Sequence, residues 1–478
     1  MALPFIGPSA PTQSVNVGVQ RLLNLYVEVT EAPNEPLTAT FYGRPGLTRL
    51  VTVPDQPGRA LVSQDGRVWA VVGGTLVELF ANHSYTVRGP VANDGRPCSL
   101  HVNGPTGHQL FVVSGGHGYI LDLLTHAFSE ITAGFPPGAL MGEYMEGYFV
   151  ALWPDHLQIS ALKNGLLWNA ADTAVPSIGP ERLVSCRVNH RELWLFGDQT
   201  TEIWYNAGTA TFPLAPVPGV FVQMGAAAPA SPARIDNRVA WLGQNEHGMR
   251  LVLLADQYSP RRISTHAVEW ALKACPTIDD FIGFSYQEAG HTCYVLTSPI
   301  NQMTWVWDAS VPEPYAWSER SWWNTPLAQD EAHRASAHAM CFGEHWVLDR
   351  ETGAVYRQTL GVYNDDGAPI RSCVRLPHLT QENRMLFYGG LELGIEPGVG
   401  LPTGQGADPI LMLRRSDDGG HTWSFERWVT AGRQGAYGTR AWWNREGRSR
   451  NRVVEIVQTD PVKRVWIWAA VDAQAGTS

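Results

Sequence analysis

The sequence predicts an all-β protein: a β-propeller of six or seven blades, followed by a C-terminal β-sandwich or jelly-roll-like domain that contains an Asp-box hairpin. Three observations point to this fold class. Short runs of alternating apolar residues, bounded by Gly, Asn, Asp or Pro, recur as hairpins, for example GRVWAVVGGTLVELF from Gly66 and RELWLFGDQTTEIWYN from Arg191. Helical patterns are scarce, and an SxDxGxTW motif stands near the C-terminus.

The hairpins are spaced like the blades of a propeller. Aligned on their first strands, about seven of them are separated by 42, 39, 44, 46, 54 and 54 residues, and propeller blades repeat about every 40 to 50 residues. A small antiparallel sheet cannot bury both faces alone, so radial stacking would supply the core. The alternative fold is a sandwich array or several small β domains. The aligned residues are Val68, Leu110, Phe149, Leu193, Val239, Cys293 and Val347.

Three segments follow from this spacing: an N-terminal extension over residues 1–40, the propeller over 41–360, and the β-sandwich over 361–478, where the period breaks. The extension contains a strand-like run from Ser14 to Val29, which would close the ring or reach a neighbouring subunit. The best helical pattern is THAVEWALKAC, with Thr265 as its cap and Pro276 as its stop.

Composition narrows the function classes. The 478 residues hold 35 Lys plus Arg against 45 Asp plus Glu, so the formal charge of −10 argues against a dedicated DNA-gripping protein. Charged residues are 17% of the chain and 19 residues are Trp, which favours a weakly charged surface that meets partner proteins. The basic residues are nearly all Arg, which suits buried interfaces or reflects a GC-rich genome.

No cofactor, metal or membrane segment is signalled. The six cysteines form no CxxC pair, and the nearest metal-like cluster, His333, His338, Cys341 and His345, lacks zinc spacing, so core or surface histidines are expected. Phosphate-binding, dinucleotide-binding and nucleophile-elbow motifs are missing. Because the sequence shows no leader and no run of about 18 apolar residues, an unsecreted chain with reduced thiols and no membrane insertion is expected.

The sharpest local motif matches the Asp box at all of its fixed positions, Ser416, Asp418, Gly420, Thr422 and Trp423. In that motif the Ser and Asp side chains bond local backbone groups, the Gly permits a positive φ, and the Trp packs beneath the turn, so a structural role is expected. Asp boxes also decorate sialidase propellers. A carbohydrate-active or receptor-binding propeller is therefore the alternative, although a sialidase also needs a Tyr nucleophile, a carboxylate and an arginine cluster that this motif does not locate.

An Arg-rich segment from Arg440 to Arg452, RAWWNREGRSRNR, is the best candidate for a protein interface. An Arg-rich hairpin on an acidic protein more often meets a partner protein than nucleic acid. The candidate interface residues are Arg440, Trp442, Trp443, Arg445, Arg448, Arg450 and Arg452.

Several long segments resemble one family, the tail hub or packaged-DNA stabilisation proteins of short-tailed bacteriophages. The resemblance covers most of the chain and is strongest towards the C-terminus. It is carried by VNVGVQRLLNLYVEV (15–29), YGRPGL (42–47), HRELWLFGDQTTEIWYNAG (190–208), RISTHAVEWAL (262–272), PHLTQENR (377–384), GVGLPTGQGADP (398–409), SDDGGHTWS (416–424) and YGTRAWW (437–443).

The resemblance implies a non-enzymatic virion protein that forms a homohexameric ring at the portal vertex, below the portal and its adaptor. The ring would close the DNA exit channel, retain the packaged genome until ejection, and offer docking sites for the tail needle and for tailspikes or tail fibres. It would be assembled in the host cytoplasm, and double-stranded DNA would pass it without sequence-specific binding. A scaffold protein of an unrelated bacterial complex is a further alternative.

Overall fold

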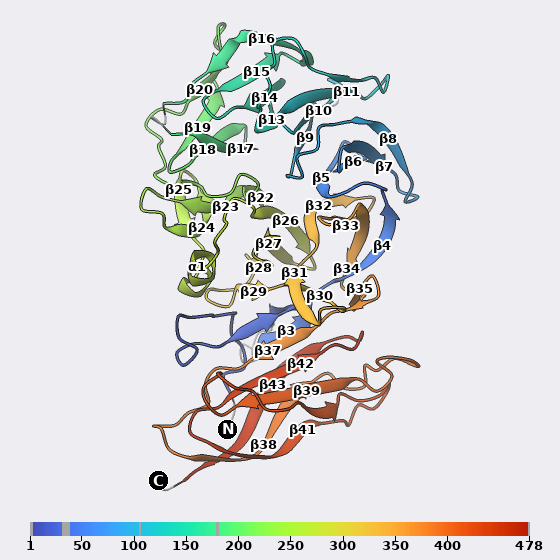
Figure 1. The fold of residues 1–478 in the computed structure, drawn as a ribbon, viewed down its shortest axis with the longest axis vertical. Coiled ribbons are helices and arrows are strands. Elements are labelled where there is room, and N and C mark those ends of the chain that lie inside the picture. The colour runs from blue at the N-terminus through green and yellow to red at the C-terminus, as the bar shows by residue number, and fades with distance from the viewer. Residues whose placement is uncertain (1–2, 31–38, 105–106, 178–180, 477–478) are drawn as a thin grey trace.

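The structure is a computed structural model that describes residues 3–30, 39–104, 107–177 and 181–476. Figure 1 shows a ring of small sheets above a layered domain, in which the N- and C-terminal parts of the chain meet. Strands dominate, and the described residues contain a single α-helix, α1 (His266–Lys273). No helix in the described part of the chain is long and apolar enough to cross a membrane.

The ring is a propeller of seven blades, numbered here in chain order. Blade 1 holds β5 (Gly58–Gln64), β6 (Arg67–Val72), β7 (Thr75–Leu79) and β8 (Tyr85–Pro90). Blade 2 holds β9 (Ser99–Val102), β10 (Gln109–Ser114), β11 (His117–Asp122) and β12 (Phe128–Glu130). Blade 3 holds β13 (Met141–Met145), β14 (Tyr148–Leu152), β15 (Leu157–Ala161) and β16 (Asn164–Ala174).

Blade 4 holds β17 (Leu183–Asn189), β18 (Glu192–Gly197), β19 (Thr201–Asn206) and β20 (Leu214–Pro216). Blade 5 has two short inner strands, β21 (Gly225–Ala226) and β22 (Ala233–Ile235), followed by β23 (Arg238–Gln244), β24 (Arg250–Asp256) and β25 (Ser259–Arg262). Blade 6 holds β26 (Ile282–Glu288), β27 (His291–Ser298), β28 (Met303–Asp308) and β29 (Trp317–Glu319). A hairpin of β30 (Ser321–Asn324) and β31 (Gln329–Ala332) leads to the last blade.

Blade 7 closes the ring with strands from two distant parts of the chain. Its inner strands are β32 (Ala335–Cys341), β33 (Glu344–Asp349) and β34 (Ala354–Thr359), and its next strand is β4 (Gly46–Thr52), which pairs antiparallel with β34. Two short strands, β35 (Asn364–Asp365) and β36 (Ala368–Pro369), extend this sheet. The strand that closes the ring therefore comes after the Ser14–Val29 run, for which closing the ring was one of the two predicted roles.

That N-terminal run joins the C-terminal domain instead. One sheet of the sandwich, here called the junction sheet, contains β1 (Arg21–Leu23), β37 (Ser372–Arg375), β42 (Val453–Gln458), β39 (Ile410–Ser416) and β40 (Arg427–Thr430). The other, here called the outer sheet, contains β2 (Leu25–Val29), β3 (Ala39–Gly43), β43 (Val465–Ala475), β38 (Leu386–Ile395) and β41 (Ala441–Ser449). Residues near both chain ends thus build one domain.

The junction sheet is continuous with blade 6, because β1 pairs in parallel with β29 at Leu23 and Glu319 and antiparallel with β37. Together these strands form one nine-stranded sheet that runs from the propeller into the sandwich. Figure 1 shows the two domains in direct contact along this line. A shared sheet resists hinge motion, since bending it would break ladder hydrogen bonds.

Buried apolar side chains gather in seven main clusters among the described residues, one between each pair of adjacent blades. The cluster between blades 5 and 6 extends from Trp317 on β29 into the sandwich, where Phe41 and Trp466 are almost fully buried, as Trp317 is. This arrangement confirms the predicted propeller and C-terminal β-sandwich. All seven aligned residues of the sequence repeat lie in the second strand from the axis of their blades, and each is buried.

Candidate interaction surfaces and the domain junction

The Asp-box turn joins β39 to β40 and so closes one hairpin of the junction sheet. The Asp418 carboxylate accepts hydrogen bonds from Ser416 Oγ and Thr422 Oγ1, each at 2.6 Å, and from the backbone N–H of His421 at 3.0 Å. Gly420 donates its N–H to Ser416 Oγ at 2.8 Å and has a φ of 107°, which favours glycine. We propose that the motif serves to hold this turn.

Replacing Asp418 by alanine is expected to lower the melting temperature by several degrees, because several local donors lose their shared acceptor. Hydrogen bonds from Ser416 and Thr422 hold the pKa of Asp418 well below its usual range. A depressed pKa adds stability above the unfolded value of about 4, and this is lost as pH falls further. Calorimetry of the wild-type and Asp418→Ala proteins from pH 7 to pH 2 should therefore show a difference in melting temperature that shrinks only below about pH 4.

An unchanged melting temperature in the Asp418→Ala protein, together with loss of a glycosidase activity, would contradict the structural role and favour the carbohydrate-active alternative.

The aromatic ring of the Asp box is held between two arginines. The guanidinium carbons of Arg375 and Arg414 each lie 4.9 Å from the centre of the Trp423 ring, within cation–π range. Both arginines bond Glu455, which stands between them in register on β42. Burial alone would raise the pKa of Glu455, but the arginines outweigh burial and lower it. The Trp423 ring therefore packs on two charged side chains, Arg375 and Arg414, which are both hydrogen-bonded to Glu455.

From Glu455 the ion pairs continue into the propeller. Arg371 lies 3.4 Å from Glu455 and donates to Asp330 on β31 at 2.9 Å. Arg21 on β1 lies 4.0 Å from the same Asp330 and pairs with Glu319 on β29 of blade 6 at 3.0 Å. Because Asp330 and Glu319 belong to the propeller side, this network links the Asp-box hairpin to blade 6.

A second buried network centres on Arg44, between β3 and β4, where the chain passes from the sandwich into blade 7. Its side chain is 1% exposed, and it pairs with Asp365, which is 0% exposed, through bonds of 2.9 and 2.5 Å. It also donates to Asn24 Oδ1 at 2.8 Å and to the carbonyl of Ser321 at 2.9 Å. Arg44 thus hydrogen-bonds to three parts of the fold: the sandwich through Asn24, the β30–β31 hairpin through Ser321, and the blade 7 sheet through Asp365.

A third polar contact crosses the junction at His291, the first residue of β27. His291 Nε2 lies 2.7 Å from Glu28 on β2, and its Nδ1 lies 2.6 Å from Asp308 at the end of β28. The Tyr26 ring packs edge-on against the imidazole at 4.8 Å. Burial alone would lower the pKa of His291, but its bonds to the two carboxylates outweigh burial and raise the pKa to about 9.

The His291 contact is expected to weaken between pH 6.5 and pH 9.5. A raised folded pKa contributes stability that is fully present below the unfolded value of about 6.5 and is lost as pH rises through the folded value. The free energy of unfolding should fall by about 1 to 3 kcal/mol more in wild type than in His291→Gln over this interval. Urea unfolding at both pH values measures this, and equal pH dependence in the two proteins would contradict it.

The Arg-rich segment is not the single hairpin that its sequence suggests. Residues 441–449 form β41 in the outer sheet, and the chain then crosses to β42 in the junction sheet. Two of its candidate interface residues lie inside the sandwich: Trp443 is 1% exposed and Arg452 is 2% exposed. Arg452 pairs with Asp417 and lies over the Tyr388 ring at 4.1 Å. The interface prediction is therefore wrong for Trp443 and Arg452, because both side chains are buried inside the sandwich of this chain.

The other candidates, Arg440, Trp442, Arg445, Arg448 and Arg450, are exposed along β41 and its ends. The Trp442 indole packs directly on Gly390 of β38, and the Trp468 indole packs directly on Gly394 of the same strand. A Cβ atom added to Gly390 would lie 2.3 Å from Trp442, and one added to Gly394 would lie 2.4 Å from Trp468, so a larger residue would not fit at either position.

The two tryptophans, 37% and 44% exposed, mark the outer face of the outer sheet, and Arg440 pairs with Glu392 there at 2.6 Å. Other exposed aromatics of this domain, which no sequence motif indicates, are Phe387, Phe425, Trp428 and Tyr437.

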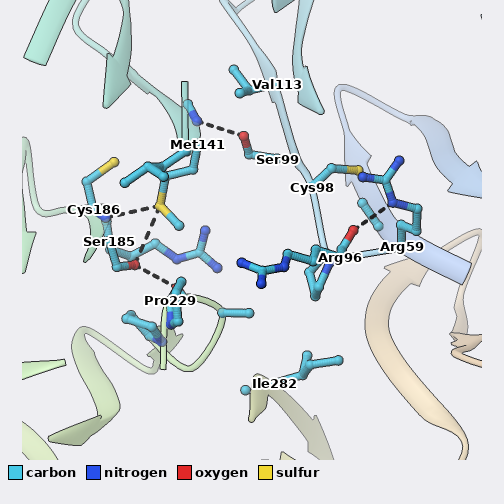
Figure 2. Close-up of a pocket in the computed structure, with 18 of the residues that line it drawn as sticks. Arg59, Arg96, Cys98, Ser99, Val113, Met141, Ser185, Cys186, Pro229 and Ile282 are labelled. Carbon is cyan, nitrogen blue, oxygen red and sulfur yellow. Dashed lines mark hydrogen bonds between the residues drawn. The ribbon is translucent and has the colours of Figure 1, made fainter. Parts of the chain in front are cut away.

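The propeller axis holds a pocket of about 1260 Å³, lined by inner strands and loops of all seven blades. Figure 2 shows Arg59, Arg96 and Cys98 on one side of this pocket and Met141, Ser185 and Cys186 on the other. Its described lining includes carboxylates and arginines, the groups that a sialidase uses. Tyr144 is the tyrosine in that lining, and its ring packs on Phe149 at 5.7 Å.

The histidine cluster considered as a metal site divides into separate contacts. His338 Nε2 lies 3.0 Å from His345 Nδ1, while His333 is buried and its ring accepts the backbone N–H of Ala335. Within the described ranges, no three side chains of His, Cys, Asp or Glu gather in a way that could hold a metal ion. The six cysteines are free thiols.

Comparison with known families agrees with this architecture. The family model described as the β-propeller of bacteriophage P22 Gp10 matches residues 20–360, and the one described as its β-sandwich matches residues 373–474. The chain belongs to the bacteriophage P22 Gp10 family. The resemblance to packaged-DNA stabilisation proteins is thereby confirmed, and this Gp10-family chain is a structural protein of a phage tail.

More distant likenesses of the Gp10-family chain carry no functional argument. No curated protein matches its sequence significantly. Among solved structures, the N-terminal domain of Nup159 shares 12% identity at a TM-score of 0.41, covering 71% of this chain and 99% of that one. Streptogramin B lyase shares 11% at 0.40, covering 66% and 98%. A chain of the mitotic checkpoint complex shares 10% at 0.43, covering 69% and 95%.

Proposed function

We propose that this protein is the tail hub that closes the DNA exit channel below the portal and adaptor rings. Six copies would form a ring that retains the packaged genome, with the tail needle filling the remaining opening. The ring would also carry docking sites for tailspikes or tail fibres. Family membership supports a tail role, and the rigid union of the two domains supports the retention role.

The observation that carries the proposal is the continuous sheet between propeller and sandwich. A ring that resists pressure from packaged DNA must transmit force between its contacts without bending. Here nine strands run from blade 6 into the sandwich, and buried ion pairs at Arg44 and Glu455 lie beside them. Breaking this junction requires loss of ladder bonds and exposure of buried charges together.

A heterologous ring needs two different patches on each subunit. We assign one to the outer sheet of the sandwich, where Trp442 and Trp468 are exposed beside Arg440, since Trp and Arg are enriched at the centres of interfaces. The second is assigned to blade 3, where the outer strand β16 and the residues next to its two ends expose four apolar side chains. These are Leu162, Leu166, Leu167 and Val175.

The net charge of −10 suits a channel through which DNA passes, because a strongly basic lumen would hold each phosphate. Retention would then be steric and would depend on affinity between rings.

Phage with this gene disrupted should package DNA and then leak it, and adding the purified protein before release should stop the leakage. DNA retention is measured on isolated particles by nuclease accessibility. A double variant, Trp442→Ala with Trp468→Ala, should fold, since both side chains are partly exposed, yet fail to restore retention. Leu124→Ala, an exposed apolar site on blade 2, is the matched control. Particles that keep their DNA but fail to adsorb to cells would overturn the retention role.

The carbohydrate-active alternative gains no specific support from the axial pocket. Among its described lining residues, no tyrosine hydroxyl bonds a carboxylate, as a sialidase nucleophile would. A fluorogenic sialoside assay on the purified chain distinguishes the tail-hub function from the carbohydrate-active alternative, because only the latter predicts release of the fluorophore.

A further inference from the structure

The axial pocket of the propeller contains a cluster of ionisable side chains from neighbouring blades. His101 on β9, Glu143 on β13, Arg187 on β17 and Arg234 on β22 come from four successive blades and all line the pocket. The Glu143 carboxylate is 1% exposed and accepts a hydrogen bond from Arg187 Nη1 at 3.0 Å. His101 Nδ1 stands 3.5 Å from the other Glu143 oxygen. We call these four residues the axial cluster.

The axial cluster is incompletely satisfied. Arg187 Nε and Glu143 Oε2 are buried without a hydrogen-bond partner among the described residues. The Arg234 side chain forms no ion pair within the described ranges either. Two guanidinium groups therefore face one carboxylate, and this gives the cluster an excess of one positive charge before His101 is counted. Buried unsatisfied donors are rare in folded proteins and commonly mark the place of a ligand or an ordered water.

The titration behaviour of the cluster agrees with excess positive charge. The pKa of Arg234 is lowered, first because the surrounding protein displaces water from its charged form and also because Arg187 repels it, despite Glu143. Burial lowers the pKa of His101 as well. Glu143 opposes this shift, and Arg187 and Arg234 add to it. A bound group that carries negative charge would favour the charged forms of both Arg234 and His101.

We propose that the axial cluster is a binding site for one small oxyanion group, a phosphate or a carboxylate. Arg234 and the Arg187 guanidinium, whose side chain is 33% exposed, would donate to it, because guanidinium forks match the oxygens of both groups. Glu143 would limit affinity by repelling the anion while it holds Arg187 in place. The pocket, at about 1260 Å³, has room for a larger molecule that carries such a group. This site is independent of the ring and of DNA retention.

Isothermal titration of the full chain with sodium phosphate, sodium acetate and N-acetylneuraminic acid, at constant ionic strength in chloride, tests the site. Phosphate binding alone would assign a free phosphate or phosphoryl group, and binding of the two carboxylates would assign a carboxylic acid. Arg234→Gln is expected to weaken binding by about 10-fold or more, since it removes a charge-assisted donor. Glu143→Gln is expected to strengthen it by roughly 10-fold, since it removes the repelling charge.

Arg261→Gln is the matched control, because Arg261 lies on β25 of the same blade as Arg234 but on its outer edge. It should bind as wild type does. Should Glu143→Gln fail to fold, the pair Arg234→Gln and Arg261→Gln still decides the question. No heat of binding above chloride for any of the three anions would overturn the proposal. Equal weakening in Arg234→Gln and Arg261→Gln would also overturn it, because the binding would then be nonspecific.

Discussion

Replacing Asp365 by alanine is expected to lower the free energy of unfolding by about 3 to 5 kcal/mol, because it leaves the Arg44 guanidinium buried without its counter-charge. Both side chains are almost completely inaccessible, so water cannot take the place of the lost carboxylate. The remaining acceptors of Arg44 are Asn24 Oδ1 and the carbonyls of Pro45 and Ser321, which are neutral and offset only part of the loss. Urea unfolding followed by Trp fluorescence measures the change.

Two companions make the Asp365 prediction specific. The double variant Arg44→Met with Asp365→Ala removes both charges, and it should recover much of the stability that the single variant loses. The exposed pair of Lys463 and Glu396 serves as control, since Glu396→Ala should cost only about 0 to 1 kcal/mol. A loss in Asp365→Ala no greater than in Glu396→Ala would show that the buried pair does not hold the two domains together.

Local patterns explain which parts of this fold could be predicted. The repeat of alternating apolar residues depends only on neighbours in sequence, and it placed all seven second strands correctly. The helix is equally local: Thr265 caps α1 by accepting from the Val268 N–H, and Val268 and Leu272 are buried, as predicted. Strand pairing between distant segments carries no such local signal. The sequence therefore predicted neither the choice between six and seven blades nor the entry of β1 into the sandwich.

The same limit applies to the candidate sites. The bonds of Ser416, Asp418 and Thr422 lie within one turn, so the motif alone indicates them. The groups around Trp423 are less local: Arg375 comes from β37, and the Glu455 carboxylate that bonds both Arg375 and Arg414 comes from β42. Tandem tryptophans at 442 and 443 point to opposite faces of a strand. Which of them is buried depends on which sheet receives β41, so the sequence could not show that Trp443 is internal.

Replacing Glu455 by glutamine is expected to cost about 2 to 4 kcal/mol, because three arginines then share a site without its carboxylate. This loss of stability is smaller than the one expected for the fully buried Arg44–Asp365 pair. The arginines around Glu455 are 15% to 33% exposed, so water screens part of their mutual repulsion. Arg375 and Arg414 should also separate, and the Trp423 ring should lose the pair between which it lies. A shifted indole signal for Trp423 in NMR spectra would report this.

Glu455 also distinguishes coupling between the domains from the stability of the sandwich alone. Glu446 is a similarly buried carboxylate that pairs with Arg415 and Arg427, both within the sandwich. Glu446→Gln should weaken the sandwich yet leave one cooperative unfolding transition. Glu455→Gln cuts the path through Arg371 to Asp330, so its transition should broaden or divide as the domains unfold separately. If both variants keep a single sharp transition, the shared sheet couples the domains without the ion pairs, and force in the assembled ring would pass through its ladder bonds.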